Sequence, residues 1–302
     1  MNYTDFEEKI LHYRNKQYYS LFKKILDSGC ENLNYSVVKG DALSKLAYGR
    51  VNQRFYNDVD VIVSRANLKE LNYILFKCGY AQREHSREEN ILFLSASHQT
   101  LPYTCKHNYL TIDINFDILW GEYEGKRIDI EEFLSDTIEM EIYGVKVKTL
   151  PPLKTMIQLI LHHYKDMNSL FLLATRKSIR YDMFKDVYYL LKNNLDAIPL
   201  DKLYAMSVEY EIIPYVFYVL FYTGQVFDDD VLKQYIEAFR TPEGDALLNC
   251  YGLCEKERRE WKCDLKTRLD SDHLYELIKA DLTERDQEKI AINKRIFMGI
   301  NE

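Results

Sequence analysis

Residues 54–63 read Arg-Phe-Tyr-Asn-Asp-Val-Asp-Val-Ile-Val. The run from Asp58 to Val63 is rich in β-branched residues and alternates in polarity, which predicts a strand with one buried face. Alternate residues of a strand share a face and rise about 3.3 Å each, so Asp58 and Asp60 project side by side. Mg²⁺ takes oxygen ligands and usually binds one or two carboxylates together with substrate phosphates, so the pair is a candidate metal and nucleotide site. Two solvent-facing acids are the alternative, because short motifs of this kind often occur by chance.

A strand, a tight turn and a helix precede this segment. Residues 35–38 are β-prone, Lys39-Gly40-Asp41 is the predicted turn, and residues 42–47 begin a helix for which Asp41 is the predicted N-cap. Glycine lets the backbone approach a ligand closely, and a helix N-terminus directs free N–H groups at an anion. We therefore predict a phosphate-binding turn at Gly40, with an ordinary turn glycine as the alternative.

A third carboxylate lies on a later predicted strand. Residues 110–118 alternate between apolar and polar side chains, which indicates a strand that carries Asp113 on its polar face. If this strand is the neighbour of residues 58–63, Asp113 completes a set of acids that can hold two metal ions for an in-line displacement at phosphorus.

The remaining pattern divides the chain near residue 150. Before that point we expect a helix over 4–28, a helix over 67–78, a strand over 91–94 and a turn between two strands at 143–145. Beyond Pro151-Pro152 we expect helices over 152–164, 169–193, 200–210, 212–223 and 229–239, and a charged helical tail from about 244. The prediction is an α/β domain over residues 1–150 and an all-helical domain over residues 151–302.

Composition limits the class of protein. Of the 302 residues, 40 are Lys or Arg and 47 are Asp or Glu, so the formal net charge is −7. Hydrophobic residues make up 47% of the chain. A disordered or collagen-like chain is excluded.

The sequence has no apolar run of membrane-spanning length and no signal-peptide pattern, so we expect a cytoplasmic protein without a membrane partner. The acidic balance argues against a broadly positive surface for nucleic acid but is compatible with a local basic groove. A zinc site at Cys250 and Cys254 is not expected, because no second closely spaced pair exists.

Several of these segments resemble a known family. Residues 37–43, 54–63 and 68–80 are similar to the bacterial nucleotidyltransferase family often labelled uncharacterised, within the polymerase-β-like superfamily. They are also similar to abortive-infection toxin nucleotidyltransferases, whose segments read K-G-x-A-L and R-F-S-x-D-x-D. The resemblance implies a mixed-sheet core that binds a nucleoside triphosphate with Mg²⁺, two ions being possible. Residues 112–116 resemble the family's third-acid strand, commonly I-D-L-H-W, which gives Asp113 the role of third metal ligand.

The candidate site has two groups of residues. Asp58 and Asp60 would chelate metal ions, and Asp113 would bind the catalytic ion or take the proton of the acceptor hydroxyl. The residues expected to bind the nucleotide are Lys39, Gly40, Asp41, Ser44 and Arg54. For Arg54 the choice is between a bidentate contact with phosphate and a salt bridge to one of the acids.

The sequence also departs from the family pattern. Asp41 stands where the superfamily has Gly or Ser, Asn115 replaces the usual His, and Tyr56 replaces a Ser. In the helical half, His163, Arg180 and Asp186 lie where the family has L-x-x-H and D-x-x-x-L-L. His162 and His163 are adjacent, so on a helix they point about 100° apart, and we predict that they do not face one site together.

These patterns favour a Mg²⁺-dependent nucleotidyltransferase that moves a nucleoside monophosphate from a nucleoside triphosphate, with ATP expected, to a hydroxyl acceptor. A small-molecule acceptor is favoured, and nucleic acid would be a partner only as the acceptor. Two alternatives stay open. One is a toxin-like enzyme that nucleotidylates RNA or protein. The other is a catalytically weak nucleotide-binding or interaction protein, which Asp41 and Asn115 favour.

Overall fold

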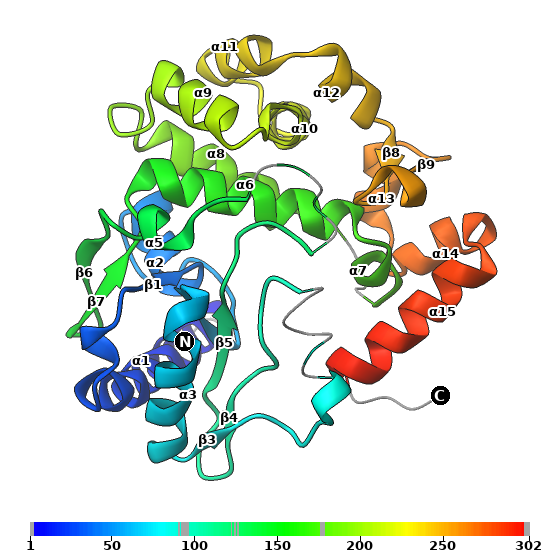
Figure 1. The fold of residues 1–302 in the computed structure, drawn as a ribbon. Coiled ribbons are helices and arrows are strands. Elements are labelled where there is room, and N and C mark those ends of the chain that lie inside the picture. Colours follow the sequence, from blue (N-terminus) through cyan, green and yellow to red (C-terminus); the bar gives the residue numbers. More distant parts are fainter. Residues whose placement is uncertain are drawn as a thin grey trace. The chain divides into compact units, whose positions relative to one another are not determined.

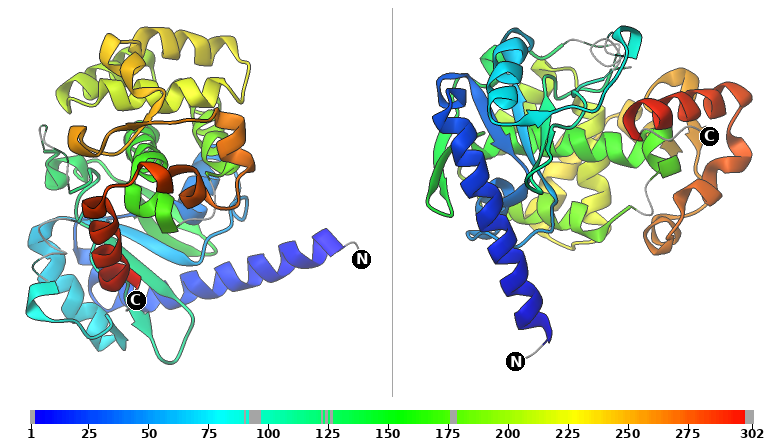
Figure 2. Two further views of the ribbon diagram at one scale, coloured as in Figure 1. Left: turned by 90° about the vertical axis from the view of Figure 1, so that its right-hand side faces the viewer. Right: turned by 90° about the horizontal axis from the view of Figure 1, so that it is seen from below.

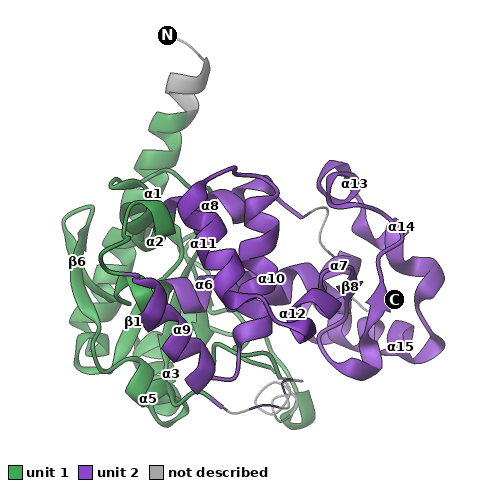
Figure 3. Ribbon diagram, turned by 90° about the horizontal axis from the view of Figure 1, so that it is seen from above, with its two compact units in different colours: residues 1–121, 128–155, 190–197 green, residues 122–127, 156–189, 198–302 purple. Residues whose placement is uncertain are grey.

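The computed structural model describes residues 3–89, 91, 97–121, 123, 125, 127–175 and 179–298. Figure 3 shows two compact units, which we call the sheet unit and the helical unit. The sheet unit contains residues 1–121, 128–155 and 190–197, and the helical unit contains residues 122–127, 156–189 and 198–302. None of the described helices is long and apolar enough to cross a membrane.

A five-stranded mixed sheet forms the centre of the sheet unit (Figure 1). Its strands are β1 (Tyr35–Val38), β2 (Asp58–Val63), β5 (Thr111–Asn115), β6 (Ile138–Ile142) and β7 (Val145–Thr149). The spatial order is β5-β2-β1-β7-β6. The pairs β2–β5 and β1–β7 are parallel, whereas β1–β2 and β6–β7 are antiparallel. The strands predicted at 35–38 and 58–63 are therefore confirmed.

One face of this sheet is apolar and is covered by two helices, α1 (Tyr3–Asp27) and α3 (Leu68–Lys77). The inward side chains of β2 and β5 belong to a single core with both helices. From the strands it includes Val59, Val61, Val63, Ile112 and Ile114, and from the helices Phe22, Ile25, Leu71, Ile74 and Leu75. Period-two alternation then sends the intervening polar residues to the opposite face. Figure 2 shows that the N-terminal turns of α1 extend beyond the sheet.

Glycines stop or turn the chain where the sequence predicted. The helix expected over 67–78 is confirmed as α3, and Gly79 follows it with φ of 84°. The turn expected at 143–145 is also confirmed, because Tyr143 and Gly144 both have positive φ between β6 and β7. A short helix, α5 (Ile130–Phe133), precedes β6, and two-residue strands β3 (Tyr80–Ala81) and β4 (Thr104–Cys105) form a small separate ladder.

The strand expected over 110–118 is shorter in the structure. The strand expected over 110–118 ends at Asn115, because the amides of Phe116 and Asp117 both donate to the carbonyl of His98. The carboxylate of Asp117 then accepts the amide of Leu119 at 3.0 Å, which turns the chain away from the sheet. Of the strand expected over 91–94, Ile91 is helical and residues 92–94 lie outside the described residues.

The helical unit contains most of the helices that follow Pro151. They are α6 (Pro152–Asn168), whose first turn belongs to the sheet unit, α7 (Leu170–Thr175), α8 (Tyr181–Lys192), whose last turn belongs to the sheet unit, α9 (Leu200–Glu209), α10 (Ile213–Gly224), α11 (Asp230–Phe239), α12 (Pro242–Leu247), α13 (Leu265–Asp270), α14 (Leu274–Ile278) and α15 (Glu284–Asn293). The prediction of one helix over 169–193 is wrong, since Ile179 and Arg180 are not helical and α7 and α8 are separate.

The expected helical tail from 244 is also interrupted. Strands β8 (Cys250–Tyr251) and β9 (Arg259–Glu260) pair antiparallel between α12 and α13. Gly252 permits this fold-back, because its φ is 102° and a Cβ there would lie 2.3 Å from the carbonyl oxygen of Glu257. The fold-back between β8 and β9 therefore depends on Gly252. Helical periodicity in the sequence does not reveal this requirement.

Candidate active site

Three aspartates project from the polar face of the sheet. In the parallel pairing of β2 and β5, Asp60 lies directly opposite Asp113, and Asp58 lies opposite Thr111. Residues directly opposite in a ladder share a face, as do residues two apart on a strand. The expectation that the two acidic strands are neighbours is therefore confirmed, and Asp58, Asp60 and Asp113 share one face.

Lys39 neutralises the central aspartate. Val38, the last residue of β1, pairs with Asp60, so the chain that leaves β1 starts next to the aspartates. The ammonium of Lys39 donates to Oδ1 of Asp60 at 2.7 Å, and the two side chains are only 16% and 9% exposed. In this structure Lys39 is therefore the counter-ion of Asp60, on the sheet face that the three aspartates share.

The pKa of Asp58 shows which charges it meets. Burial, and after it the charge of Asp60, raise the pKa of its carboxyl group to about 6, although Lys39 and Arg54 act to lower it. Lys39 and Arg54 thus lie close enough to Asp58 to interact with its charge. The structure therefore groups two of the expected metal ligands with two of the residues expected to bind the nucleotide.

The turn after β1 has an unusual backbone. Lys39 has φ of 57° and ψ of −149°, a region that is essentially restricted to glycine, and Gly40 has φ of 44°. Strain of this kind persists where the surrounding structure holds it, and it is concentrated at functional sites. Helix α2 (Gly40–Tyr48) begins directly after Lys39, its N-cap residue, whose side chain makes no capping hydrogen bond. The turn therefore presents the uncapped N-terminus of α2.

Asp41 is not the N-cap, and that prediction is wrong. Asp41 is the second residue of α2, and its fully buried carboxylate accepts hydrogen bonds from the amide of Asn52 and the hydroxyl of Tyr56. Burial, together with Tyr19 and Asp41, raises the pKa of Tyr56 far above its ordinary value, so the phenol stays protonated and donates. The Tyr56 ring also lies beside Gly40, which connects the turn to the loop over residues 49–57.

Ser44 holds the same loop. Its buried hydroxyl donates to the carbonyl of Arg50 at 2.8 Å and accepts the amide of Gln53 at 2.9 Å. The side chains of Asp41 and Ser44 are thus engaged with the loop that carries Arg54. Both residues contribute to the position of Arg54 through these bonds.

A second support for this loop comes from α1, at residues that none of the sequence motifs includes. Arg14 of α1 donates to the carbonyl of Tyr56 and, at 3.0 Å, to Oδ1 of Asn57. Asn15, which is fully buried, donates to Oδ1 of Asn52 at 3.1 Å. These contacts join parts of the chain about forty residues apart. The only sequence signal was a pair of polar residues within an apolar helical pattern.

A different cluster lies on α6 in the helical unit. The ligand atoms of His162, His163 and Asp166 all lie within 4.8 Å of one another, and Nε2 of His162 is 3.2 Å from Oδ2 of Asp166. The prediction that the two histidines do not face one site is therefore wrong, because both rings reach the Asp166 carboxylate although adjacent helical positions point about 100° apart. Among the described residues, the carboxylates of Asp58, Asp60 and Asp113 do not all lie within 4.8 Å of one another.

Two other residues of the helical half, Arg180 and Asp186, differ in exposure. Arg180 forms an exposed ion pair with Asp182 at 2.8 Å, and a pair of this kind contributes little to stability. Asp186 is 1% exposed on α8.

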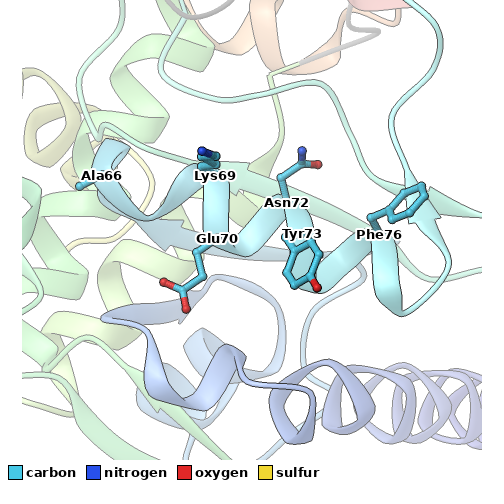
Figure 4. A pocket seen from close by; sticks show the side chains of 6 residues that line it. All are labelled: Ala66, Lys69, Glu70, Asn72, Tyr73 and Phe76. Carbon is cyan, nitrogen blue, oxygen red and sulfur yellow. The ribbon is translucent and has the colours of Figure 1, made fainter.

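An open surface pocket on α3 is not part of this site. Figure 4 shows its lining side chains, which come from one helical segment: Ala66, Lys69, Glu70, Asn72, Tyr73 and Phe76. Tyr73 and Phe76 are 59% and 72% exposed. Helix α3 covers the apolar face of the sheet, whereas the aspartates project from the other face.

The comparisons with known proteins identify the class of enzyme. A family model described as "Uncharacterised nucleotidyltransferase" matches residues 8–228, a range that includes the whole five-stranded sheet. The protein is therefore a nucleotidyltransferase. More particularly, the chain belongs to this uncharacterised nucleotidyltransferase family, which confirms the family that its sequence resembles.

One similar solved structure is described as the antibiotic-resistance factor ANT(2'')-Ia. The two chains are 16% identical, and the match covers 66% of this chain and 92% of that chain with a TM-score of 0.38. The search of curated protein sequences found no match.

Proposed function

We propose that this protein transfers a nucleoside monophosphate from a nucleoside triphosphate to a hydroxyl group of a small molecule, with Mg²⁺ as cofactor. ATP is the expected nucleotide. The observation that carries the proposal is the register of β2 and β5, which sets Asp60 opposite Asp113 with Asp58 on the same face. Family membership supplies the reaction class, and the residues around these acids support the finer assignment.

The donor atoms suit a hard divalent cation. All three side chains offer carboxylate oxygens, and the raised pKa of Asp58 shows that burial and Asp60 outweigh the nearby positive charges of Lys39 and Arg54. Asp58, Asp60 and Asp113 would hold Mg²⁺, which when bound neutralises charge on the phosphates and the leaving pyrophosphate. The oxygens are further apart than a shared ion requires, and we expect the side chains to reorient when Lys39 releases Asp60.

The protein's own residues then have distinct tasks. The uncapped N-terminus of α2 and the cations of Lys39 and Arg54 would bind phosphate oxygens. Asp113 would accept the proton of the acceptor hydroxyl, whose oxygen forms a new bond to the α-phosphorus as the bond to pyrophosphate breaks. We assign Asp41 and Ser44 a positioning role, since both hold the loop that carries Arg54.

The position of Asp41 bears on the catalytically weak alternative. A carboxylate at the start of α2 would repel a triphosphate if it faced the free N–H groups. Here the carboxylate is buried and accepts hydrogen bonds from Asn52 and Tyr56. This orientation favours the enzyme over the weak nucleotide-binding protein.

Labelled nucleoside triphosphates with Mg²⁺ and a cell extract test the proposal. The wild-type protein should release pyrophosphate and label a small-molecule fraction. Label in RNA or protein would instead support the toxin-like alternative. Absence of pyrophosphate release with every nucleotide and extract, together with no stabilisation by Mg²⁺ and any nucleotide, would refute the proposal.

The variant Asp58→Asn gives the sharpest comparison. Removal of a carboxylate that helps to fix the metal should lower turnover by orders of magnitude. The same change removes repulsion with Asp60, so the metal-free variant should be as stable as the wild type or more stable at pH 7. Asp270→Asn, at an exposed ion pair on α13, is the matched control and should leave turnover unchanged.

A further inference from the structure

Asn115 is a buried polar side chain on the same face as the three aspartates. It is the last residue of β5, two positions after Asp113, and it lies opposite Ile62 of β2. The residue is only 6% exposed, and its side-chain Nδ2 has no hydrogen-bond partner among the described residues. Because a buried donor without a partner is unfavourable, each such group calls for an explanation.

The strand directions place Asn115 relative to the phosphate-binding turn. Strand β1 runs antiparallel to β2, and Val38 pairs with Asp60, so the chain leaves β1 towards the Asp58 end of β2. Strand β5 runs parallel to β2, so Asn115 lies towards the other end, beyond Asp113. Along the strands, Asp60 and Asp113 therefore lie between the level of the turn at Gly40 and that of Asn115.

The geometry of the transfer reaction suggests a role for Asn115, which lies beyond the aspartates as seen from the turn at Gly40. In an in-line displacement the attacking and leaving oxygens lie on opposite sides of the phosphorus. If the turn at Lys39 and Gly40 binds the end of the triphosphate that leaves, the acceptor approaches from the opposite side. Asn115 is the next side chain on that side after Asp113.

We propose that the amide of Asn115 donates a hydrogen bond to an oxygen of the acceptor and holds the acceptor hydroxyl next to Asp113. This inference rests on the proposed function and adds an acceptor-binding residue to it. A primary amide does not titrate at ordinary pH and its Nδ2 can only donate, so it would recognise a lone-pair atom, which on the proposed hydroxyl-bearing acceptor is an oxygen. Asn115 is a binding residue in this scheme.

The variant Asn115→Leu tests the proposal, because leucine is similar in size and has no donor. The probe is the ultrafiltrate of a cell extract, titrated against labelled ATP and Mg²⁺. We expect the amount of ultrafiltrate needed for half-maximal transfer to rise about tenfold, the loss typical of one hydrogen bond. The KM for ATP and the thermal shift produced by Mg²⁺ and ATP should stay as in the wild type.

Two further measurements separate binding from a structural role. The melting temperature of metal-free Asn115→Leu should equal or exceed that of the wild type, because the replaced donor has no partner in the described chain. Asn115→His, which keeps an N–H donor, should recover part of the lost acceptor affinity. A destabilised Asn115→Leu with weakened ATP binding, or an unchanged requirement for ultrafiltrate, would overturn the proposal.

Failure of the proposed function has a different signature. A wild-type protein that transfers no label and gains no stability from Mg²⁺ and nucleotide would refute both proposals. A wild-type protein that is active, beside an Asn115→Leu variant with identical acceptor titration, would refute only the role of Asn115.

Discussion

The ammonium of Lys39 lies 2.7 Å from Oδ1 of Asp60, and this pair joins the strained turn after β1 to the acidic face of β2. A lysine thus neutralises a carboxylate that we propose as a metal ligand. When Mg²⁺ and a nucleotide bind, we expect both partners to change, with Lys39 moving to phosphate and Asp60 to the metal. The pair would then keep the ligand-free site compact and break as the site fills.

Lys39→Met should lower the stability of the ligand-free protein. The substitution leaves the largely buried carboxylate of Asp60 without its cation, and we expect a loss of roughly 1–3 kcal/mol in the free energy of unfolding. Because Lys39 acts to lower the pKa of Asp58, that pKa should also rise above its present value of about 6. Urea unfolding and NMR titration measure the two effects. Lys69→Met, at an exposed position of α3, is the control, and equal stability of the two variants would contradict this role for Lys39.

The pH dependence of stability should reveal Asp58. Its pKa is about 6 in the folded protein and near 3.9 in an unfolded chain, so the folded state binds more protons between these values. The stability that protonation of Asp58 adds to the folded state is therefore fully present below about pH 4. It is lost as the pH rises through about 6. Relative to Asp58→Asn, the metal-free wild type should lose on the order of 2 kcal/mol over this window. Parallel urea curves for the two proteins at pH 4.5 and pH 7 provide the test, and an identical change in both would contradict the assignment.

Binding of Mg²⁺ and ATP should have the opposite pH dependence. A metal ion competes with the proton on Asp58, so the ligand-induced rise in melting temperature should increase as the pH rises through about 6. Thermal shifts measured from pH 5 to pH 8 test this, with sodium chloride at matched ionic strength as the control. A shift that is largest at pH 5 would argue against Asp58 as a ligand.

Tyr56→Phe should destabilise the loop that carries Arg54. The substitution removes the hydroxyl that donates to the fully buried carboxylate of Asp41, and we expect a cost of about 1–3 kcal/mol. Tyr109→Phe is the matched control, because Tyr109 is 93% exposed. A double-mutant cycle with Asp41→Asn measures the coupling between the two residues. Additive effects in that cycle would show that the hydrogen bond contributes little.

Gly40→Ala should be unfavourable because of its backbone conformation. Gly40 has φ of 44°, while the atoms nearest to an added Cβ would be those of the Tyr56 ring, at an ordinary distance of 3.6 Å. We expect a cost of about 1–2 kcal/mol for Gly40→Ala and a smaller one for Gly40→Asn, since asparagine tolerates positive φ better. Gly49→Ala, at φ of 72° with open space around it, is the control. Calorimetry should show weaker binding of Mg²⁺ and ATP in the Gly40 variants only, and undiminished binding would leave Gly40 as a turn residue.

Local patterns predicted the secondary structure of the sheet unit well. The strand at 58–63, the turn at 143–145 and the stop at Gly79 follow from alternation, a two-residue turn and a positive φ, which are properties of neighbouring residues. The errors arose where distant residues act on the chain. Strand β5 stops early because His98 accepts two amides, and Asp41 leaves the cap position because Asn52 and Tyr56 bind its carboxylate.

The residues of the candidate site also fall into two groups, those placed by local sequence and those placed by tertiary packing. Alternation along one strand is a local property, so residues 58–63 alone show that Asp58 and Asp60 share a face. The neighbour of that strand depends on how all five strands and their covering helices pack, so only the tertiary structure sets Asp113 opposite Asp60 and Asn115 beyond it. It alone also reveals that Lys39 neutralises Asp60, because that contact joins residues 21 positions apart in the chain.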